Sequence, residues 1–257
     1  LRPAVPVDAV VFFDGNITFA ELVLTGLLAF AAGIISCLIS RPYGRQIGVI
    51  AVPAGLAAVS FRSGDMATLL KANATLELRG AVYASLRWEG FLWLIVVVAG
   101  LLGAVVGNII WPGKSDKLIE NDVLVPNGRK SKNLYINILA SILATVVITH
   151  FVIKMFARDV IVNNRTASVV AQPANLQAAF AVFVGFMAAG FAVKYFLRSS
   201  YIWPMAAAGI VCMLEMSLAG RAGVLTELSQ NWPIGFYFNG NSGVLPIQYI
   251  AFGGLGS

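Results

Sequence analysis

Long apolar stretches, separated by short polar segments, divide this 257-residue chain. About 20 helical residues cross the hydrocarbon core of a bilayer, so runs of this length predict membrane-spanning helices. The predicted spans are 18–40, 47–61, 91–111, 134–156, 176–197 and 201–220, and the apolar segment 244–257 is a candidate for the start of a further span. The pattern predicts an all-α integral membrane protein, a single polytopic bundle of about six transmembrane helices joined by short loops.

The second apolar run differs from the others in length. Residues 47–61 would extend roughly 23 Å as a helix, which is short of the roughly 30 Å hydrocarbon core. The run also contains Pro53 and Gly55. Three alternatives stay open: a short span with local bilayer thinning, which we favour, a broken helix, or a re-entrant segment.

Two extramembrane segments have patterns typical of strands. Residues 70–79 alternate apolar and polar positions strictly, which indicates a short strand with one polar face. Residues 159–162 and 167–170 are rich in β-branched side chains and flank a polar turn, which predicts a small hairpin. Small β-elements are therefore expected outside the membrane.

The composition excludes an ordinary water-soluble domain. The chain is 58% hydrophobic and 12% charged, with a mean hydropathy of +0.81, whereas an average soluble domain is about 25% charged. Lipid must therefore be the solvent for much of the surface. The net charge of +6 fits basic loops beside anionic headgroups. No basic run is interleaved with aromatics, so we expect no nucleic-acid partner.

The distribution of basic residues indicates the orientation. Loops 41–46, 111–132 and 198–200 have the higher density of Lys and Arg and are predicted to be cytoplasmic, which places the N-terminus on the non-cytoplasmic side. The chain starts at Leu1 and stops within an apolar segment, so we expect both ends to be truncated.

Three Asn-x-Thr sequons fall on the predicted outer side. Their acceptors are Asn16, Asn73 and Asn164. They are candidate glycosylation sites if the source organism glycosylates that compartment, and the alternative, which we favour, is that they are unmodified.

Small residues recur at four-residue spacing in two spans. Gly103 and Gly107 lie in the third span, and Ala29 and Gly33 lie in the first. Such faces let helices approach closely inside lipid. They form either a surface for a partner subunit or, the alternative we favour, the internal packing of the bundle.

Three ionisable residues lie inside predicted spans at a similar inferred depth, in the outer third of the bilayer. They are Glu215 in the sixth span, with His150 and Lys154 in the fourth. Ionisable groups at this depth are costly and often functional. One hypothesis is a proton or ion path through a cluster of these groups. The alternative is that Lys154 extends to the headgroups while Glu215 makes one structural salt bridge.

The chain contains no P-loop, GxGxxG after a strand, GxSxG or HExxH motif, and no metal-ligand spacing. We therefore expect no cofactor, no metal and no catalytic residues, although a membrane enzyme stays an alternative. The sequence favours a non-catalytic subunit of a larger membrane assembly that packs through small-residue faces with other subunits or with copies of itself. The alternative is a transporter or channel with an ion or proton path near Glu215 and His150.

Overall fold

The computed structural model is a bundle of helices. It describes residues 10–12, 19–40, 43–62, 64, 66–73, 75–111, 134–157, 173–221, 223–225 and 240–257. All regular secondary structure in these residues is helical, which confirms the predicted all-α class.

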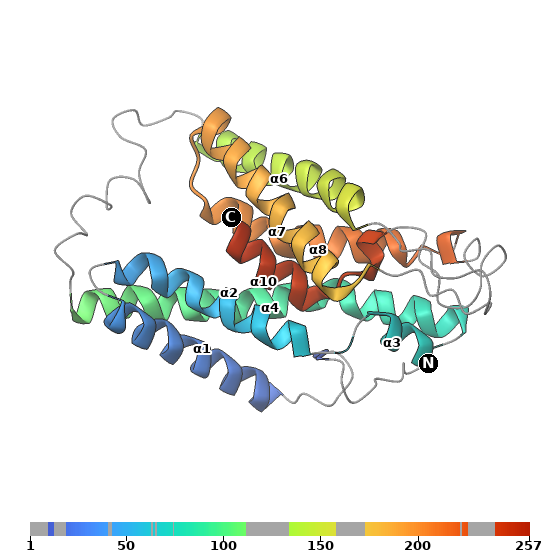
Figure 1. Cartoon of the computed structure of the whole chain (residues 1–257), viewed down its shortest axis with the longest axis horizontal. Helices are drawn as coiled ribbons and strands as arrows, with labels where there is room; N and C mark the ends of the chain where they lie inside the picture. Colours follow the sequence, from blue (N-terminus) through green and yellow to red (C-terminus); the bar gives the residue numbers. More distant parts are fainter. Residues whose placement is uncertain are drawn as a thin grey trace.

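Ten helical elements make up the described chain. They are α1 (Phe19–Ile39), α2 (Gly44–Arg62), α3 (Met66–Ala72), α4 (Leu76–Ile110), α6 (Leu134–Phe156), α7 (Asn175–Ala192), the π-helix η1 (Val193–Leu197), α8 (Ile202–Ala219), the 3₁₀ turn η2 (Gly240–Gly243) and α10 (Pro246–Gly256). Helices α1, α2 and α4 pack on one another, and α6 packs on α7 and α8 (Figure 1). Between these two groups lies α10, which contacts α2, α4, α7 and α8.

Five of the described helices are long and apolar enough to cross a membrane. They are α1, α4, the Tyr135–Phe156 part of α6, α7 together with η1 (Asn175–Leu197), and α8. This supports a multi-pass integral membrane protein. The second predicted span, 47–61, lies within α2, a continuous helix with Pro53 inside it, whose apolar part, Ile47–Arg62, is shorter than the other five helices.

Helix α4 begins much earlier than the span predicted at 91–111. Its 35 residues extend roughly 52 Å, well beyond the hydrocarbon core. The helix begins where it does because the side chain of Thr75 accepts a hydrogen bond from the Leu78 N–H at 3.3 Å, a typical N-cap.

The prediction of a strand at 70–79 is wrong. The segment holds the end of α3, a turn at Asn73 and the start of α4. Local hydrogen bonds decide this: Asn73 Nδ2 donates to the Leu69 carbonyl at 2.9 Å, and Arg79 Nε donates to the Asn73 carbonyl at 3.2 Å. The alternating pattern therefore reflects polar residues at the end of α3, in the turn and at the start of α4, and not one face of a strand. The hairpin predicted at 159–170 lies outside the described residues.

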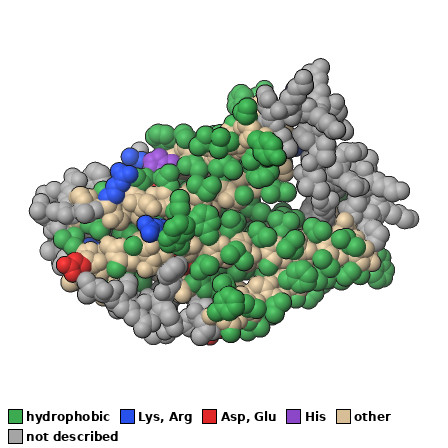
Figure 2. Space-filling view, turned by 180° about the vertical axis from the view of Figure 1, so that it is seen from behind, with side chains coloured by type: hydrophobic (Ala, Val, Ile, Leu, Met, Phe, Trp, Pro, Cys, Tyr) green, Lys and Arg blue, Asp and Glu red, His purple; other side chains and the backbone are tan. Residues whose placement is uncertain are grey.

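The outer surface of the bundle is apolar. Hydrophobic side chains cover most of the face in Figure 2, and charged side chains gather toward one end. Large exposed side chains include Leu27 and Leu28 on α1, Phe151 on α6 and Phe191 on α7. Such a surface fits contact with lipid.

The small-residue faces of α1 and α4 meet each other inside the chain. A Cβ atom added to Gly33 would lie 2.1 Å from the Gly100 carbonyl oxygen, and one added to Gly103 would lie 2.0 Å from the Phe30 carbonyl oxygen. Ala29 and Gly107 are buried in the same contact. These residues therefore serve internal packing between α1 and α4.

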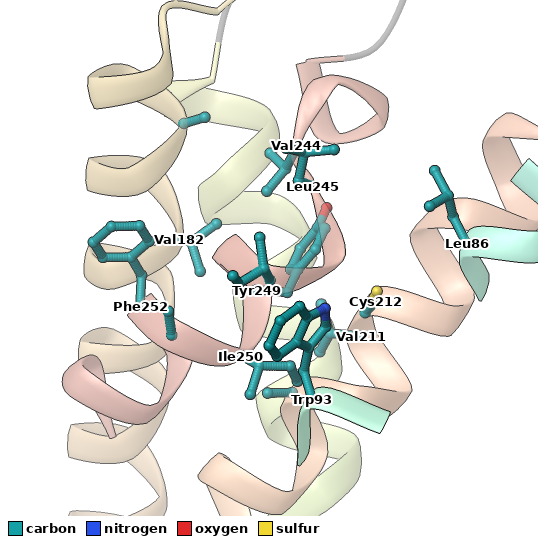
Figure 3. Close-up of a cluster of buried hydrophobic side chains, with 14 of the residues drawn as sticks. Leu86, Trp93, Val182, Val211, Cys212, Val244, Leu245, Tyr249, Ile250 and Phe252 are labelled. Atoms are coloured by element: carbon teal, nitrogen blue, oxygen red, sulfur yellow. The ribbon is translucent and has the colours of Figure 1, made fainter. Parts of the chain in front are cut away.

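The apolar C-terminal segment 244–257 forms α10 inside the bundle. Most of its side chains are buried, with Tyr249 at 0% exposure. Figure 3 shows Tyr249 and Ile250 packed among Val182 of α7, Val211 of α8 and Trp93 of α4. The residues proposed to begin a further span thus face other helices along the described length.

Candidate functional site

A histidine–carboxylate pair joins two helices of the bundle. His150 Nδ1 of α6 lies 2.5 Å from Glu215 Oε1 of α8. The Glu215 side chain is 1% exposed and the His150 side chain 23% exposed. Because α7 lies between α6 and α8 in the chain and the three helices pack antiparallel, α6 and α8 run in the same direction (Figure 1). The C-terminal thirds of α6 and α8, which carry His150 and Glu215, therefore lie at the same end of the bundle.

The C-terminal part of the chain covers this pair. Asn241 Nδ2, in η2, lies 3.3 Å from His150 Nδ1 and donates to the His150 carbonyl at 3.3 Å. The Tyr249 hydroxyl of α10 donates to the Asn241 carbonyl at 2.9 Å. The turn can approach α6 because residue 240 is glycine: a Cβ there would overlap the Ala157 carbonyl oxygen. The contact with Asn241, 91 residues later in the chain, thus adds a further polar group beside His150.

Three buried polar atoms around the pair have no hydrogen-bond partner among the described residues. They are Glu215 Oε2, Asn241 Oδ1 and Thr149 Oγ1. An unsatisfied buried polar group costs about 1–3 kcal/mol. Each of these atoms can accept a hydrogen bond from a further partner, such as a water molecule.

A file of hydroxyl groups continues from the pair along the buried face of α6. Ser141, Thr145 and Thr149 follow at four-residue spacing, and each is fully buried. The Ser141 hydroxyl donates to the Asn137 carbonyl at 2.6 Å, and the Thr145 hydroxyl donates to the Ser141 carbonyl at 2.7 Å. Both oxygens keep acceptor capacity toward the interior. The sequence analysis missed this file, although the four-residue spacing within an apolar span could have indicated it.

Lys154 is not part of the pair. It lies one turn beyond His150 on α6, and its side chain is exposed. Within the described part of the chain it forms no ion pair with Glu215. Of the three ionisable residues singled out from the sequence, the structure brings together Glu215 and His150.

A second carboxylate is buried in the bundle. Glu89 of α4 is 0% exposed, and its Oε1 accepts hydrogen bonds of 3.1 Å from Trp93 Nε1 and from the Phe12 N–H. Its Oε2 has no partner among the described residues. The sequence analysis missed Glu89 because the span predicted at 91–111 left it outside the membrane.

The other candidate residues lie away from the pair. Asn73 is fully buried and its side-chain nitrogen donates to the Leu69 carbonyl, and its use as a glycosylation site stays a prediction. Asn16 and Asn164 lie outside the described residues. No group of three or more His, Cys, Asp or Glu suited to a metal occurs in the described ranges, and the expected lack of a cofactor stays a prediction.

The arrangement is suited to exchanging a proton. An imidazole and a carboxylate in direct contact can hold one proton between them, and the exposed edge of His150 offers it access from outside the bundle. No protein-family model, no curated protein and no solved structure matches this chain.

Proposed function

We propose that this chain is a membrane transporter that moves protons and that the His150–Glu215 pair is its proton-exchanging site. The observation that carries the proposal is the 2.5 Å contact between His150 Nδ1 and Glu215 Oε1, with the carboxylate 1% exposed. Ionisable groups inside a membrane bundle are costly, and those retained there often mark ion or proton routes.

The chemistry of the two side chains favours protons as the transported species. Histidine is the side chain whose ordinary titration lies nearest neutral pH, so it gains and loses a proton readily. The carboxylate of Glu215 is in direct contact with the imidazole of His150, so a hydrogen bond can hold a proton between the two side chains. With His150 partly exposed and Glu215 buried, a proton can enter at the imidazole and pass inward.

The hydroxyl file supports a route beyond the pair. Ser141, Thr145 and Thr149 extend over eight residues of α6, about 12 Å at 1.5 Å per residue. Their buried oxygens can orient water molecules, which relay protons in apolar surroundings. The route would run from His150 toward the end of the bundle where α6 begins.

Proton flux into liposomes tests the proposal. The full chain is reconstituted with a pH-sensitive dye inside, and a membrane potential drives protons inward. We expect wild-type protein to acidify the lumen, and Glu215→Gln and His150→Gln each to lower the rate by about 100-fold, the scale of removing a proton-transferring side chain. Glu21→Gln, which alters an exposed acid in the first turn of α1, should retain the flux. Unchanged flux in Glu215→Gln would contradict the proposal.

A non-catalytic subunit of a larger membrane assembly is the second candidate. The observation in its favour is the scarcity of buried charge: among the described residues only Arg79, Glu89 and Glu215 are buried and ordinarily charged. The small-residue faces no longer support it, because α1 and α4 occupy them within the chain. Purified protein that carries no flux alone and co-migrates with other membrane proteins in mild detergent would favour this role.

A further inference from the structure

Glu89 is a fully buried carboxylate that the His150–Glu215 pair does not use. It lies in α4, at 0% exposure, within a bundle whose outer surface is apolar. One of its oxygens, Oε1, is held by Trp93 Nε1 and by the Phe12 N–H, each at 3.1 Å. The Phe12 and Trp93 rings pack on each other with centroids 4.1 Å apart, which shields that oxygen. The other oxygen, Oε2, has no partner among the described residues.

This arrangement is costly unless Oε2 binds something. Two neutral donors at Oε1 do not balance a full negative charge, and no described cation forms an ion pair with Glu89. Burial of an unpaired carboxylate in an apolar interior is strongly unfavourable, whereas a bound proton removes the charge. The fixed Oε1 therefore leaves Oε2 as the position at which a proton attaches.

Glu89 and Glu215 share a neighbour in the bundle. Gly90, the residue after Glu89, packs against Cys212 of α8, where a Cβ on Gly90 would lie 2.9 Å from Cys212 Sγ. Cys212 precedes Glu215 by about one turn of α8, so the contact at Gly90 brings the part of α4 that carries Glu89 against the part of α8 that carries Glu215.

Residues of α10 pack against the parts of α4 and α8 that lie near Glu89 and Cys212. Figure 3 shows Trp93, the donor to Glu89, beside Val211 and Cys212, with Tyr249 and Ile250 of α10 next to it. Contacts among α4, α8 and α10 thus enclose both acids. Each presents one oxygen without a partner among the described residues.

We propose that Glu89 is a second proton-binding carboxylate of the path that begins at the His150–Glu215 pair. In the transfer, the pair loses a proton to intervening water, and that water gives a proton to Glu89 Oε2, so that one O–H bond forms for each bond to hydrogen that breaks. The proposal rests on the proposed function and adds to its route a second acid, on α4.

Glu89→Gln tests this inference. The amide carbonyl of Gln can accept the hydrogen bonds from Trp93 and Phe12, so the fold should survive, but Gln cannot bind and release a proton. We expect the liposome flux to fall by about 100-fold, with an unchanged unfolding temperature in detergent. The matched control is Glu77→Gln, an exposed acid in the first turn of the same helix, which should retain the flux.

The set of variants separates the two proposals. Flux at the wild-type rate in Glu89→Gln, together with lost flux in Glu215→Gln, would overturn the role of Glu89 and leave the pair in place. Wild-type flux in both variants would overturn the proposed function and this inference with it.

A labelling experiment on the wild-type chain does not depend on how a variant folds. Hydrophobic carbodiimides react with protonated carboxyl groups in apolar interiors. We expect the reagent to modify Glu89 and stop the flux, with the adduct located by mass spectrometry of proteolytic peptides. Modification of other acids without any adduct at Glu89 would overturn the inference.

Discussion

Gly33 and Gly26 show how two identical residues on one helix can differ in role. A Cβ on Gly33 would meet the Gly100 carbonyl oxygen at 2.1 Å, whereas one on Gly26 would meet nothing within 4 Å. Both occur in α1 and look alike in the sequence. Because the two residues are seven apart, they lie on the same side of α1, so the difference lies in how closely α4 approaches α1 along its length.

Alanine at these two positions should therefore have opposite effects. Gly33→Ala should separate α1 from α4 and destabilise the chain by about 2 kcal/mol, the scale of overpacking a tight contact. Gly26→Ala should be neutral or stabilising by about 0.5–1 kcal/mol, because alanine favours helix. Unfolding in mixed detergent micelles measures both. Equal destabilisation by the two changes would contradict the packing of α1 on α4.

Some residues of the candidate site could be identified from the sequence, but the contacts between them could not. Glu215 and His150 stand out because charged groups are rare inside apolar runs, and their similar inferred depth suggested a cluster. Their 2.5 Å contact could not be inferred, since it depends on the rotation of α6 and α8 about their axes. Asn241 and Tyr249 could not be recognised from the sequence, because Asn241 reaches His150 only when the turn η2 packs against α6, and Tyr249 bonds to Asn241.

Helix α6 combines an apolar exterior with a polar inner face. Its exposed positions include Leu139, Leu143 and Val147, while Ser141 and Thr145 are fully buried. A hydroxyl in this setting can bond to its own helix and still accept from water. The face that carries the hydroxyl file is therefore where we expect the proton route to continue.

Thr145→Val should test the role of that face. The change keeps the shape of the side chain and removes its hydroxyl, and we expect the proton flux to fall by about tenfold, equivalent to about 1.4 kcal/mol, the order of one hydrogen bond. Thr25→Val is the matched control, because the Thr25 hydroxyl makes the same bond to a carbonyl four residues earlier, at 2.8 Å to Glu21, on α1. Equal proton fluxes in wild type and Thr145→Val would contradict a proton route along the hydroxyl file of α6.

The helices were predicted correctly as a type of element, but the residue at which α4 begins was not. The apolar runs located the helices because burial in lipid requires long apolar stretches whose backbone groups bond internally. The start of α4 was missed because its first turns carry Glu77, Arg79 and Glu89, which resemble an extramembrane segment. That error hid Glu89 from the list of candidate residues.

At the scale of the whole molecule, the orientation in the membrane stays a prediction. The density of basic residues favours a cytoplasmic loop at 198–200 and a non-cytoplasmic N-terminus. The structure supplies two positions at opposite ends of α8, Ser199 before it and the exposed Gly223 after it, which can report on the two sides.

Cysteine labelling at these positions should establish the orientation. We expect Gly223→Cys to react with a membrane-impermeant maleimide added to intact cells, and Ser199→Cys to react only after permeabilisation. The native Cys37 and Cys212 are buried and should give little background. The reverse pattern would contradict the predicted orientation and would place the His150–Glu215 pair near the cytoplasmic side.

The sequence by itself determined the class of this protein and the approximate position of its long helices. Apolar length and the scarcity of charge are enough for that, because lipid accepts only segments that satisfy their own backbone hydrogen bonds. Only the tertiary structure decided which faces meet. It placed Gly33 against Gly100, His150 against Glu215, and Gly90, the residue after Glu89, against Cys212. These contacts join residues far apart in the chain and depend on helix rotation and tilt, which hydrophobicity alone does not specify.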